Sequence, residues 1–225
     1  MKFNDGHWQI PENLELLQPV DVHSVRVDGD ELVVIVSSRP LKTRGDQLNL
    51  MVFTIRLFAA AEGVIGVRIE HYQGVNPQLP EFTLYRERNI ARIEETDDAM
   101  LIHAGSVAAR VPKSGPYTLD FLRDGKRISG ARAKTGGYAK DTDDNARYLF
   151  ERLDLAVGEN VYGLGERFAS FVKNGQSIDI WNRDDGTGTE QAYKNIPFFM
   201  TSNGWGLLVN HPVKVEFEIA SDKVS

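Results

Sequence analysis

The sequence predicts an all-β protein, a β-sandwich of antiparallel strands with little helix. Three observations support this prediction. Short segments that alternate apolar and polar side chains recur along the 225-residue chain, as half-buried strands do. Turn-forming residues separate these segments about every eight to twelve residues, a spacing typical of sandwiches and barrels. Long segments with helical periodicity are lacking, so a βαβ fold is not indicated.

A first hairpin is expected within residues 53–70. It follows a β-branched segment, 32–36, that predicts a strand because turn formers flank it on both sides. In 53–58 the large apolar residues recur with a period of two, at Phe53, Ile55 and Leu57. Glu62-Gly63 then provides a turn into the strand predicted at 64–70.

A second hairpin is expected around Asp124-Gly125. Residues 117–121 alternate before this pair, and the return strand begins at Arg127-Ile128. Asp-Gly supplies the positive φ angles that a type I′ turn requires. Further strands are predicted at 91–95, 99–103, 106–111, 148–154, 177–181, 206–210 and 213–219.

Two segments are predicted to lack strands. A short helix is expected at 166–171, although Gly163 and Gly165 disfavour it. Residues 133–147 are polar and rich in turn formers, which predicts a surface loop, with a domain boundary as the alternative. Because the chain stops shortly after the strand predicted at 213–219, we expect it to be one amino-terminal domain, 1–225, of a longer protein.

The composition excludes several classes of function. A net charge of −6 with scattered Lys and Arg argues against a nucleic-acid partner. Cysteine is absent, which excludes disulfides and thiolate chemistry. The first residues form no secretory signal, and no apolar stretch is long enough for a membrane helix. We therefore expect a cytoplasmic protein with no membrane partner; the sequence is compatible with a homo-oligomer.

The five histidines, at 7, 23, 71, 103 and 211, have no metal-ligand spacing, so neither a metal nor another cofactor is predicted. Gly163 and Gly165 form only part of a dinucleotide fingerprint, because Phe168 stands where its third glycine would be. No GxSxG elbow and no phosphate-binding loop occur.

Aromatic, Asn, Asp and Arg residues gather with glycine in residues 161–212. Rings stack on the apolar face of a pyranose, while carboxylates and amides bind its hydroxyl groups, so this composition suits a sugar site. The alternative is that Trp181, Phe198 and Trp205 are core aromatics and that Asp184-Asp185-Gly186 is only a turn. The residue types alone leave both interpretations open.

Several blocks in this region resemble one family. They are VYGLGERF at 161–168, WNRD at 181–184, EQAYKNIPF at 190–198 and VNHP at 209–212. Together with GVRIEH at 66–71, LDFLRDG at 119–125 and FERLDL at 150–155, they resemble the amino-terminal domain of family-31 glycoside hydrolases, most closely bacterial α-xylosidases. The resemblance extends over nearly the whole chain.

The resemblance implies a sandwich of the galactose-mutarotase-like fold packed beside a (β/α)₈ barrel. In this family the barrel carries two Asp residues for a retaining double displacement, so no catalytic residue is expected in this chain. By resemblance, Asp184 is a ligand of a sugar hydroxyl, Trp181 and Arg183 position the loop or line the pocket, and Asp185 is a further substrate-binding candidate. Gly163, Gly165, Glu166, Arg167 and Phe168 are expected to serve structure at the domain junction, with Glu166 and Arg167 pairing with neighbours across it.

The expected function is therefore that of a non-catalytic domain. It would contribute a loop to a pocket for α-xylosides or α-glucosides that the barrel completes, and the fragment alone would be inactive. One alternative is an independent carbohydrate-binding module, which needs exposed, coplanar aromatics in 181–205. Another is a mutarotase-like sugar epimerase, which needs a His acid and a Glu base facing one cleft. Glu70 and His71 point to opposite faces of a strand and do not provide that pair.

Overall fold

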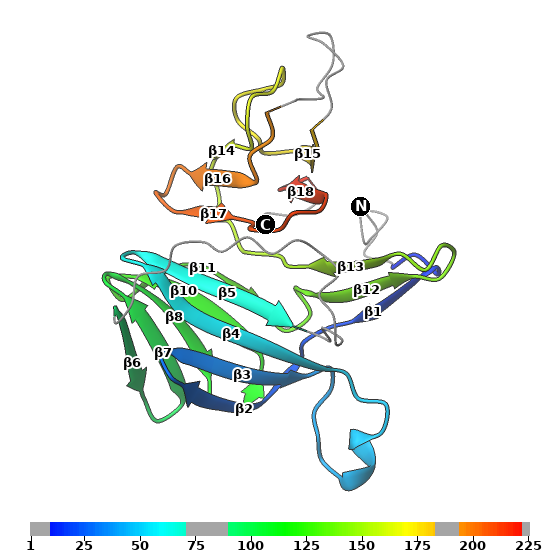
Figure 1. The fold of residues 1–225 in the computed structure, drawn as a ribbon, viewed down its shortest axis with the longest axis vertical. Coiled ribbons are helices and arrows are strands. Elements are labelled where there is room, and N and C mark those ends of the chain that lie inside the picture. Colours follow the sequence, from blue (N-terminus) through cyan, green and yellow to red (C-terminus); the bar gives the residue numbers. More distant parts are fainter. Residues whose placement is uncertain (1–9, 71–89, 183–193, 222–225) are drawn as a thin grey trace. The chain divides into compact units, whose positions relative to one another are not determined.

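The computed structural model describes residues 10–70, 90–182 and 194–221 (Figure 1). The chain divides into two compact units. Glu12–Leu153 form the larger unit, and Met1–Pro11 with Asp154–Ser225 form the smaller unit. No helix of the described residues is both long and apolar enough to cross a membrane.

The larger unit consists of antiparallel strands. They are β1 (Leu14–Leu17), β2 (Asp21–Asp28), β3 (Glu31–Ser37), β4 (Val52–Ala61), β5 (Val64–Glu70), β6 (Ala91–Glu95), β7 (Ala99–Ala104), β8 (Val107–Pro112), β9 (Gly115–Pro116), β10 (Thr118–Arg123), β11 (Lys126–Arg132), β12 (Gly137–Asp141) and β13 (Arg147–Phe150). A 3₁₀ turn, η1 (Arg44–Gln47), lies between β3 and β4. The sheets have the orders β5-β4-β3-β2-β9, β11-β10-β8-β7-β6 and β1-β12-β13.

The two five-stranded sheets pack face to face and enclose one apolar core (Figure 1). From the first sheet, Phe53, Ile55 and Leu57 are almost completely buried, as their period of two predicted. From the second, Ile102 and Val111 are equally buried in the same cluster. The predicted β-sandwich is therefore confirmed, since alternate side chains of both sheets fill the space between them.

Both predicted hairpins are present. Asp124 and Gly125 have φ values of 50° and 75° and connect β10 to β11, the positive angles that a type I′ turn requires. The turn at Glu62-Gly63 connects β4 to β5, and Gly63 has φ 73°. Local turn chemistry thus sets the pairing of neighbouring strands in this unit.

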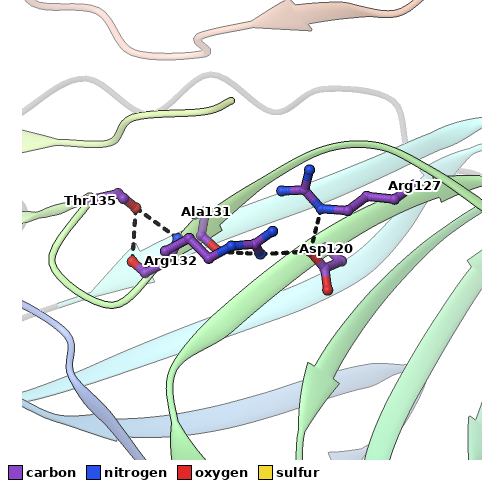
Figure 2. A network of polar contacts seen from close by, with 5 residues as sticks. All are labelled: Asp120, Arg127, Ala131, Arg132 and Thr135. Carbon is purple, nitrogen blue, oxygen red and sulfur yellow. Dashed lines mark hydrogen bonds and ion pairs between the residues drawn. The ribbon is translucent and has the colours of Figure 1, made fainter. Parts of the chain in front are cut away.

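A polar network lies on the β10–β11 pair (Figure 2). One Asp120 carboxylate oxygen accepts hydrogen bonds from Arg127 Nε at 2.6 Å and Arg132 Nη1 at 2.8 Å. The Thr135 hydroxyl donates to the Arg132 carbonyl and accepts from the Arg132 amide. Partial burial alone would raise the pKa of Asp120, but the hydrogen bonds from Arg132 and Arg127 outweigh burial and hold this pKa below its usual value.

The loop prediction for residues 133–147 is wrong in part. Residues 137–141 form β12, which pairs with β1 and β13, and β13 begins at Arg147. Turn conformations are confined to the short stretches around Lys134 and Asn145, which have positive φ values. The strand was hidden because Gly137 and Ala139, its inward-facing residues, have small side chains that produce no apolar alternation. Strand β13 also ends at Phe150, earlier than predicted.

The described residues of the smaller unit form five short strands. They are β14 (Val161–Gly163), β15 (Gln176–Ile180), β16 (Phe198–Thr201), β17 (Gly206–Leu208) and β18 (Val215–Ile219), arranged as β14-β16-β17 and β15-β18. Their inward side chains form a second apolar cluster that includes Val161, Leu164, Ile178, Phe199 and Phe217. The predictions at 177–181, 206–210 and 213–219 correspond to β15, β17 and β18.

The predicted helix at 166–171 is absent. Gly163, Leu164 and Gly165 all have positive φ values, which a right-handed helix cannot continue. Side chains, not helical amides, bind the carbonyls of this region: Lys173 Nζ donates to the Ser170 carbonyl at 2.7 Å, and the Gln176 amide donates to Val172. The segment is an ordered loop held by side-chain-to-backbone hydrogen bonds.

Candidate functional site

The sequence-predicted site begins where β15 ends. Trp181 follows Ile180 directly, and 51% of its surface is exposed. Asn182, next along the chain, is also exposed. Arg183, Asp184 and Asp185 lie outside the described residues, so their predicted roles stay predictions. The site can therefore be built from its two flanks, residues 181–182 and 194–195, which we call the loop base.

Asn195 joins the two flanks of the loop base. Its Nδ2 donates hydrogen bonds to the Trp181 carbonyl at 2.9 Å and to Asn182 Oδ1 at 3.0 Å. Its backbone amide also donates to Asn182 Oδ1, at 3.2 Å. The chain thus leaves the described fold after Asn182 and re-enters it at Lys194 beside the same two residues.

Arg167 fixes the loop base to the rest of the smaller unit. Its Nε donates to the Leu164 carbonyl at 3.1 Å, and its Nη2 donates to the Asp179 carbonyl at 2.5 Å. The same Nη2 donates to Oδ1 of Asn195. One half-buried guanidinium therefore connects the 164–167 loop, strand β15 and the loop base.

Steric constraints at this site explain why position 165 of the 161–168 block is glycine. Gly165 has φ +88°, and a Cβ placed on it would lie 2.1 Å from the Lys194 carbonyl oxygen, so only glycine fits. This close approach allows the Glu166 amide to donate to that carbonyl at 3.0 Å. Leu164 has φ 67°, and its fully buried side chain in the apolar cluster offsets the strain of that angle.

Glu166 and Arg167 both have partners within the smaller unit, and their expected pairing across a domain junction stays a prediction. The Glu166 carboxylate lies 3.2 Å from Lys194 Nζ, and both side chains are more than half exposed. An ion pair this exposed adds little stability. The exposed Glu166 carboxylate does not lie in the buried, apolar environment that raises the pKa of a catalytic carboxylic acid.

The aromatic residues of 181–205 lie in two different environments, one packed against the core and one exposed to solvent. Trp205 packs against the apolar cluster, with its ring 5.6 Å from that of Phe199, so the core interpretation holds for Trp205. Trp181 and Phe198 are exposed, so that interpretation is wrong for them. Phe198, Met200 and Leu208 form an exposed apolar surface on the outer face of the β16–β17 hairpin, in which Phe198 lies opposite Leu208.

The larger unit contains one His–Glu contact that the sequence did not indicate. His103 Nε2 lies 3.1 Å from Glu94 Oε2, across the β6–β7 pair. Arg92 also binds this carboxylate and is the main cause that holds the pKa of Glu94 below its usual value. Because the two side chains touch, a sugar cannot lie between them as an epimerase acid and base require. In the described ranges no group of three His, Asp or Glu residues could hold a metal ion.

A comparison with family models and curated proteins decides the relationship. The model of the glycosyl hydrolase 31 N-terminal galactose mutarotase-like domain matches residues 54–218. The chain belongs to this family. It is 37% identical over 224 residues to the α-xylosidase XylQ of Lactiplantibacillus pentosus, covering all of this chain and 29% of the relative. It is 34% identical over 245 residues to an α-xylosidase of Emericella nidulans, again covering the whole chain and 31% of the relative.

The chain thus spans about a third of the length of these curated family-31 relatives. Solved structures share the fold of this chain. The cycloalternan-forming enzyme from Listeria monocytogenes, in complex with a pentasaccharide substrate, gives a TM-score of 0.71 at 20% identity over 92% of this chain and 19% of that chain. A family-31 dextranase from Flavobacterium johnsoniae, complexed with glucose, gives 0.67 at 20% identity over 93% and 24%.

The matched region of the family-31 domain contains every residue of the loop base. Sequence reasoning missed Asn195 and Asn182 as partners, because the bonds between them connect positions 13 residues apart with no periodic pattern. The available signal was that Asn182 directly precedes the 183–193 segment and that Asn195 lies two residues after its end. Their pairing is a property of the fold and not of either block alone.

Proposed function

We propose that this chain is a non-catalytic domain of an α-xylosidase-like retaining glycosidase and that its 183–193 segment helps to form the sugar pocket. In this proposal a catalytic barrel in the same polypeptide supplies both carboxyl groups of the reaction. Asp184 accepts hydrogen bonds from sugar hydroxyls, Trp181 and Arg183 position the loop or line the pocket, and Asp185 is a further substrate-binding residue. The 225-residue chain alone is inactive.

One observation carries the proposal. The loop base holds both ends of the 183–193 segment beside each other through the Asn195 side chain, at 2.9 and 3.0 Å. A segment anchored at both ends can present a carboxylate in a constant place, as pocket loops on rigid scaffolds do. Its proposed substrate class comes from the relatives, which are named α-xylosidases.

The exposed apolar surface of the β16–β17 hairpin supports the domain role. Met200 and Leu208 are each more than half exposed beside Phe198. Such a surface is typical of a buried contact, and relatives about three times as long as this chain have the additional polypeptide to cover it. The occupant that we propose is the barrel of the same polypeptide.

The retaining chemistry assigns the pocket loop a binding role. Two carboxyl groups about 5 Å apart form and hydrolyse a glycosyl intermediate, and the proposal places both in the barrel. A carboxylate from this chain then binds hydroxyls remote from the scissile bond. Binding energy there orients the anomeric carbon, and its loss lowers the rate as well as the affinity.

The test is hydrolysis of p-nitrophenyl α-D-xyloside and α-D-glucoside. The 225-residue chain is compared with a polypeptide in which the barrel follows it, and activity is expected only in the longer protein. Asp184→Ala in the longer protein should lower kcat/KM by about 10- to 200-fold, the loss of one charged hydrogen bond of about 1.5–3 kcal/mol. Asp97→Ala, at an exposed turn of the larger unit, is the matched control.

Unchanged kinetics in Asp184→Ala would refute the pocket role. Turnover by the 225-residue chain would refute the non-catalytic role and make Glu166, Asp184 and Asp185 candidates for the chemistry. Binding of xylose by the short chain alone would favour a carbohydrate-binding module. Phe199 is buried and Trp205 is partly buried against it, so among these aromatics a stacking surface would have to come from the exposed Trp181 and Phe198.

A further inference from the structure

We propose that Asn203 is a site of spontaneous covalent modification, at which attack by the Gly204 amide nitrogen converts asparagine to aspartate and isoaspartate. Two Asn-Gly pairs occur in the chain, at residues 174–175 and 203–204. In such a pair the glycine has no side chain to hinder the approach of its amide nitrogen to the asparagine Cγ. The fold places the two pairs in different surroundings, so we expect only Asn203 to react in the folded protein. This modification needs no substrate and is independent of the proposed sugar pocket.

The reaction balances with water as its only co-reactant. The Gly204 nitrogen, after losing its proton to water, forms a bond to Cγ of Asn203. The Cγ–Nδ2 bond breaks, and ammonia leaves after taking up a proton, so that a cyclic succinimide remains. Water then adds to one of the two carbonyls of this ring. Opening at the former side-chain carbonyl gives aspartate with a normal backbone, whereas opening at the backbone carbonyl gives isoaspartate, in which the chain runs through the side-chain carbon.

The Asn174 side chain is held away from this reaction. Its Oδ1 accepts a hydrogen bond from the Val161 amide at 2.8 Å, and its Nδ2 donates to the Glu159 carbonyl at 2.8 Å. Both ends of the side-chain amide are thus bound to the chain that leads into β14, which keeps its Cγ from turning toward Gly175. The Gly175 amide donates to the Ile219 carbonyl at 2.7 Å, at the end of the β15–β18 pair. Reaction at Asn174 therefore requires a large opening of the smaller unit.

Asn203 lies in the turn that connects β16 to β17 (Figure 1). It is exposed, and so are Ser202 and Gly204 on either side of it. The Gly204 amide donates to the Thr201 carbonyl at 3.0 Å, a bond within the turn itself. Opening an exposed turn breaks the contacts of only a few residues and costs little free energy. The Gly204 nitrogen therefore becomes available for attack without unfolding of the sheet.

Isoaspartate at position 203 is expected to disturb this turn. It adds one carbon atom to the backbone between Asn203 and Gly204. The turn is closed on both sides of that link, by the bond from the Gly204 amide to the Thr201 carbonyl and by a bond of 2.8 Å from the Thr201 amide to the Trp205 carbonyl. A longer backbone cannot keep both bonds in the same geometry. Because Trp205 takes part in the closure, its fluorescence should report the change.

The experiment follows both Asn-Gly pairs in one protein. The 225-residue chain is incubated at pH 8 and 37 °C, folded and in guanidinium chloride, and the peptides that contain each pair are quantified by mass spectrometry after digestion at acidic pH. In the folded chain, Asn203 should convert at least about 10-fold faster than Asn174, because only the turn opens readily. In guanidinium chloride the two rates should agree within about two-fold, because the dipeptide is the same and the native contacts are gone.

Asn203→Gln and Asn203→Asp are the matched variants. Glutamine keeps an exposed amide but would have to close a larger ring, which forms more slowly, so the acidic species that accumulate in the wild type should not accumulate in Asn203→Gln. Asn203→Asp carries the new charge on a normal backbone. It should melt like the fresh wild type, because an exposed charge costs little, whereas the incubated wild type should show an earlier fluorescence-detected transition.

The comparison between the two pairs decides the proposal. Equal conversion of Asn203 and Asn174 in the folded chain would overturn it, because the fold would then not select between them. An unmodified Asn203, after a time in which Asn174 converts in guanidinium chloride, would overturn it as well. Acidic species that form in Asn203→Gln as fast as in the wild type would place the modification at another residue and would have the same consequence.

Discussion

Different kinds of interaction stabilise the larger unit and the smaller unit of this chain. In the larger unit, β2 to β5 pair in chain order, and so do β6 to β8. Their inward side chains fill a continuous apolar core. In the smaller unit, β14 pairs with β16 and β15 pairs with β18, so partners lie far apart in the sequence. Its loops depend on Arg167, Asn195 and Lys173, which bind carbonyl groups.

This difference separates stability from function. The larger unit offers many redundant apolar contacts, so a single polar change on its surface costs little. The smaller unit has a small core, and a few hydrogen bonds decide the course of the chain near the proposed pocket. We therefore expect apolar truncations to have their largest effect on the larger unit and backbone or amide changes to have theirs on the smaller unit.

The two units can be followed separately by spectroscopy. Residues 12–153 contain no tryptophan, whereas all three tryptophans of the chain, Trp8, Trp181 and Trp205, belong to the smaller unit. Tryptophan fluorescence therefore reports unfolding of the smaller unit, and far-UV circular dichroism reports both.

The largest expected effect on stability is that of Ile55→Ala in the larger unit. Ile55 is 1% exposed and lies opposite Val34 and Ile69 in β4. Its truncation should destabilise the sandwich by about 2–5 kcal/mol through lost burial and a cavity. Denaturant unfolding followed by circular dichroism measures the loss. Phe121, which is only partly buried against the same core, should cost less on truncation.

Val52→Ala on the same strand is the control, because Val52 is exposed. It should cost less than about 1 kcal/mol. Equal losses for Ile55→Ala and Val52→Ala would contradict the facing of β4.

Gly165→Ala should have the next largest effect, and it should act on the smaller unit. The new methyl group would lie 2.1 Å from the Lys194 carbonyl oxygen at a backbone φ of +88°. The backbone must move, so we expect a loss of about 2–4 kcal/mol and an earlier fluorescence transition.

Gly175→Ala separates the two causes of that loss. Gly175 has φ +83°, but nothing lies within 4 Å of a Cβ placed there. It should therefore cost only the strain of the positive φ, about 1 kcal/mol. If both variants lose the same stability, the close approach between Gly165 and Lys194 is not what shapes the loop base.

These cases also indicate how far the sequence could predict the molecule. The larger unit was largely predictable, because Phe53, Ile55 and Leu57 alternate locally and Asp124-Gly125 carries its own turn geometry. Strand β12 was not predicted, because the small inward side chains of Gly137 and Ala139 give no visible alternation of apolar and polar residues. The loop base was not predictable, since Arg167 and Asn195 meet across 28 residues by a hydrogen bond between their side chains, which leaves no periodic pattern in the sequence. The family resemblance identified the sequence blocks of the site, whereas the contacts between these blocks are visible only in the structure.

A smaller effect with a defined pH dependence is expected for Asp120→Asn. The Asp120 side chain is 17% exposed and is bound by Arg127 and Arg132. Removing its charge should cost about 1–2 kcal/mol at pH 7, because both arginines are partly solvated. Unfolding of both proteins at pH 7 and pH 3 measures the difference.

The direction of this pH dependence follows from the lowered pKa of Asp120 in the folded protein. In the unfolded chain this carboxyl titrates near about 3.9, so its contribution to stability is complete above that pH. The contribution is lost as the pH falls through the lower folded-state pKa. The difference between wild type and Asp120→Asn should therefore shrink at pH 3, whereas Asp97→Asn should show little difference at either pH. A difference that grows on acidification would contradict the network in Figure 2.

The smallest effect is expected for Glu166→Gln, although Glu166 adjoins both Gly165 and Arg167. Its carboxylate pairs with Lys194 at 3.2 Å while both side chains remain mostly exposed, so the pair contributes less than about 1 kcal/mol. The Glu166 backbone amide, which donates to the Lys194 carbonyl at 3.0 Å, is kept in this variant. Fluorescence-detected melting at low and at high salt should thus show nearly the wild-type transition. A loss as large as that of Gly165→Ala would mean that charge, and not backbone fit, closes the loop base.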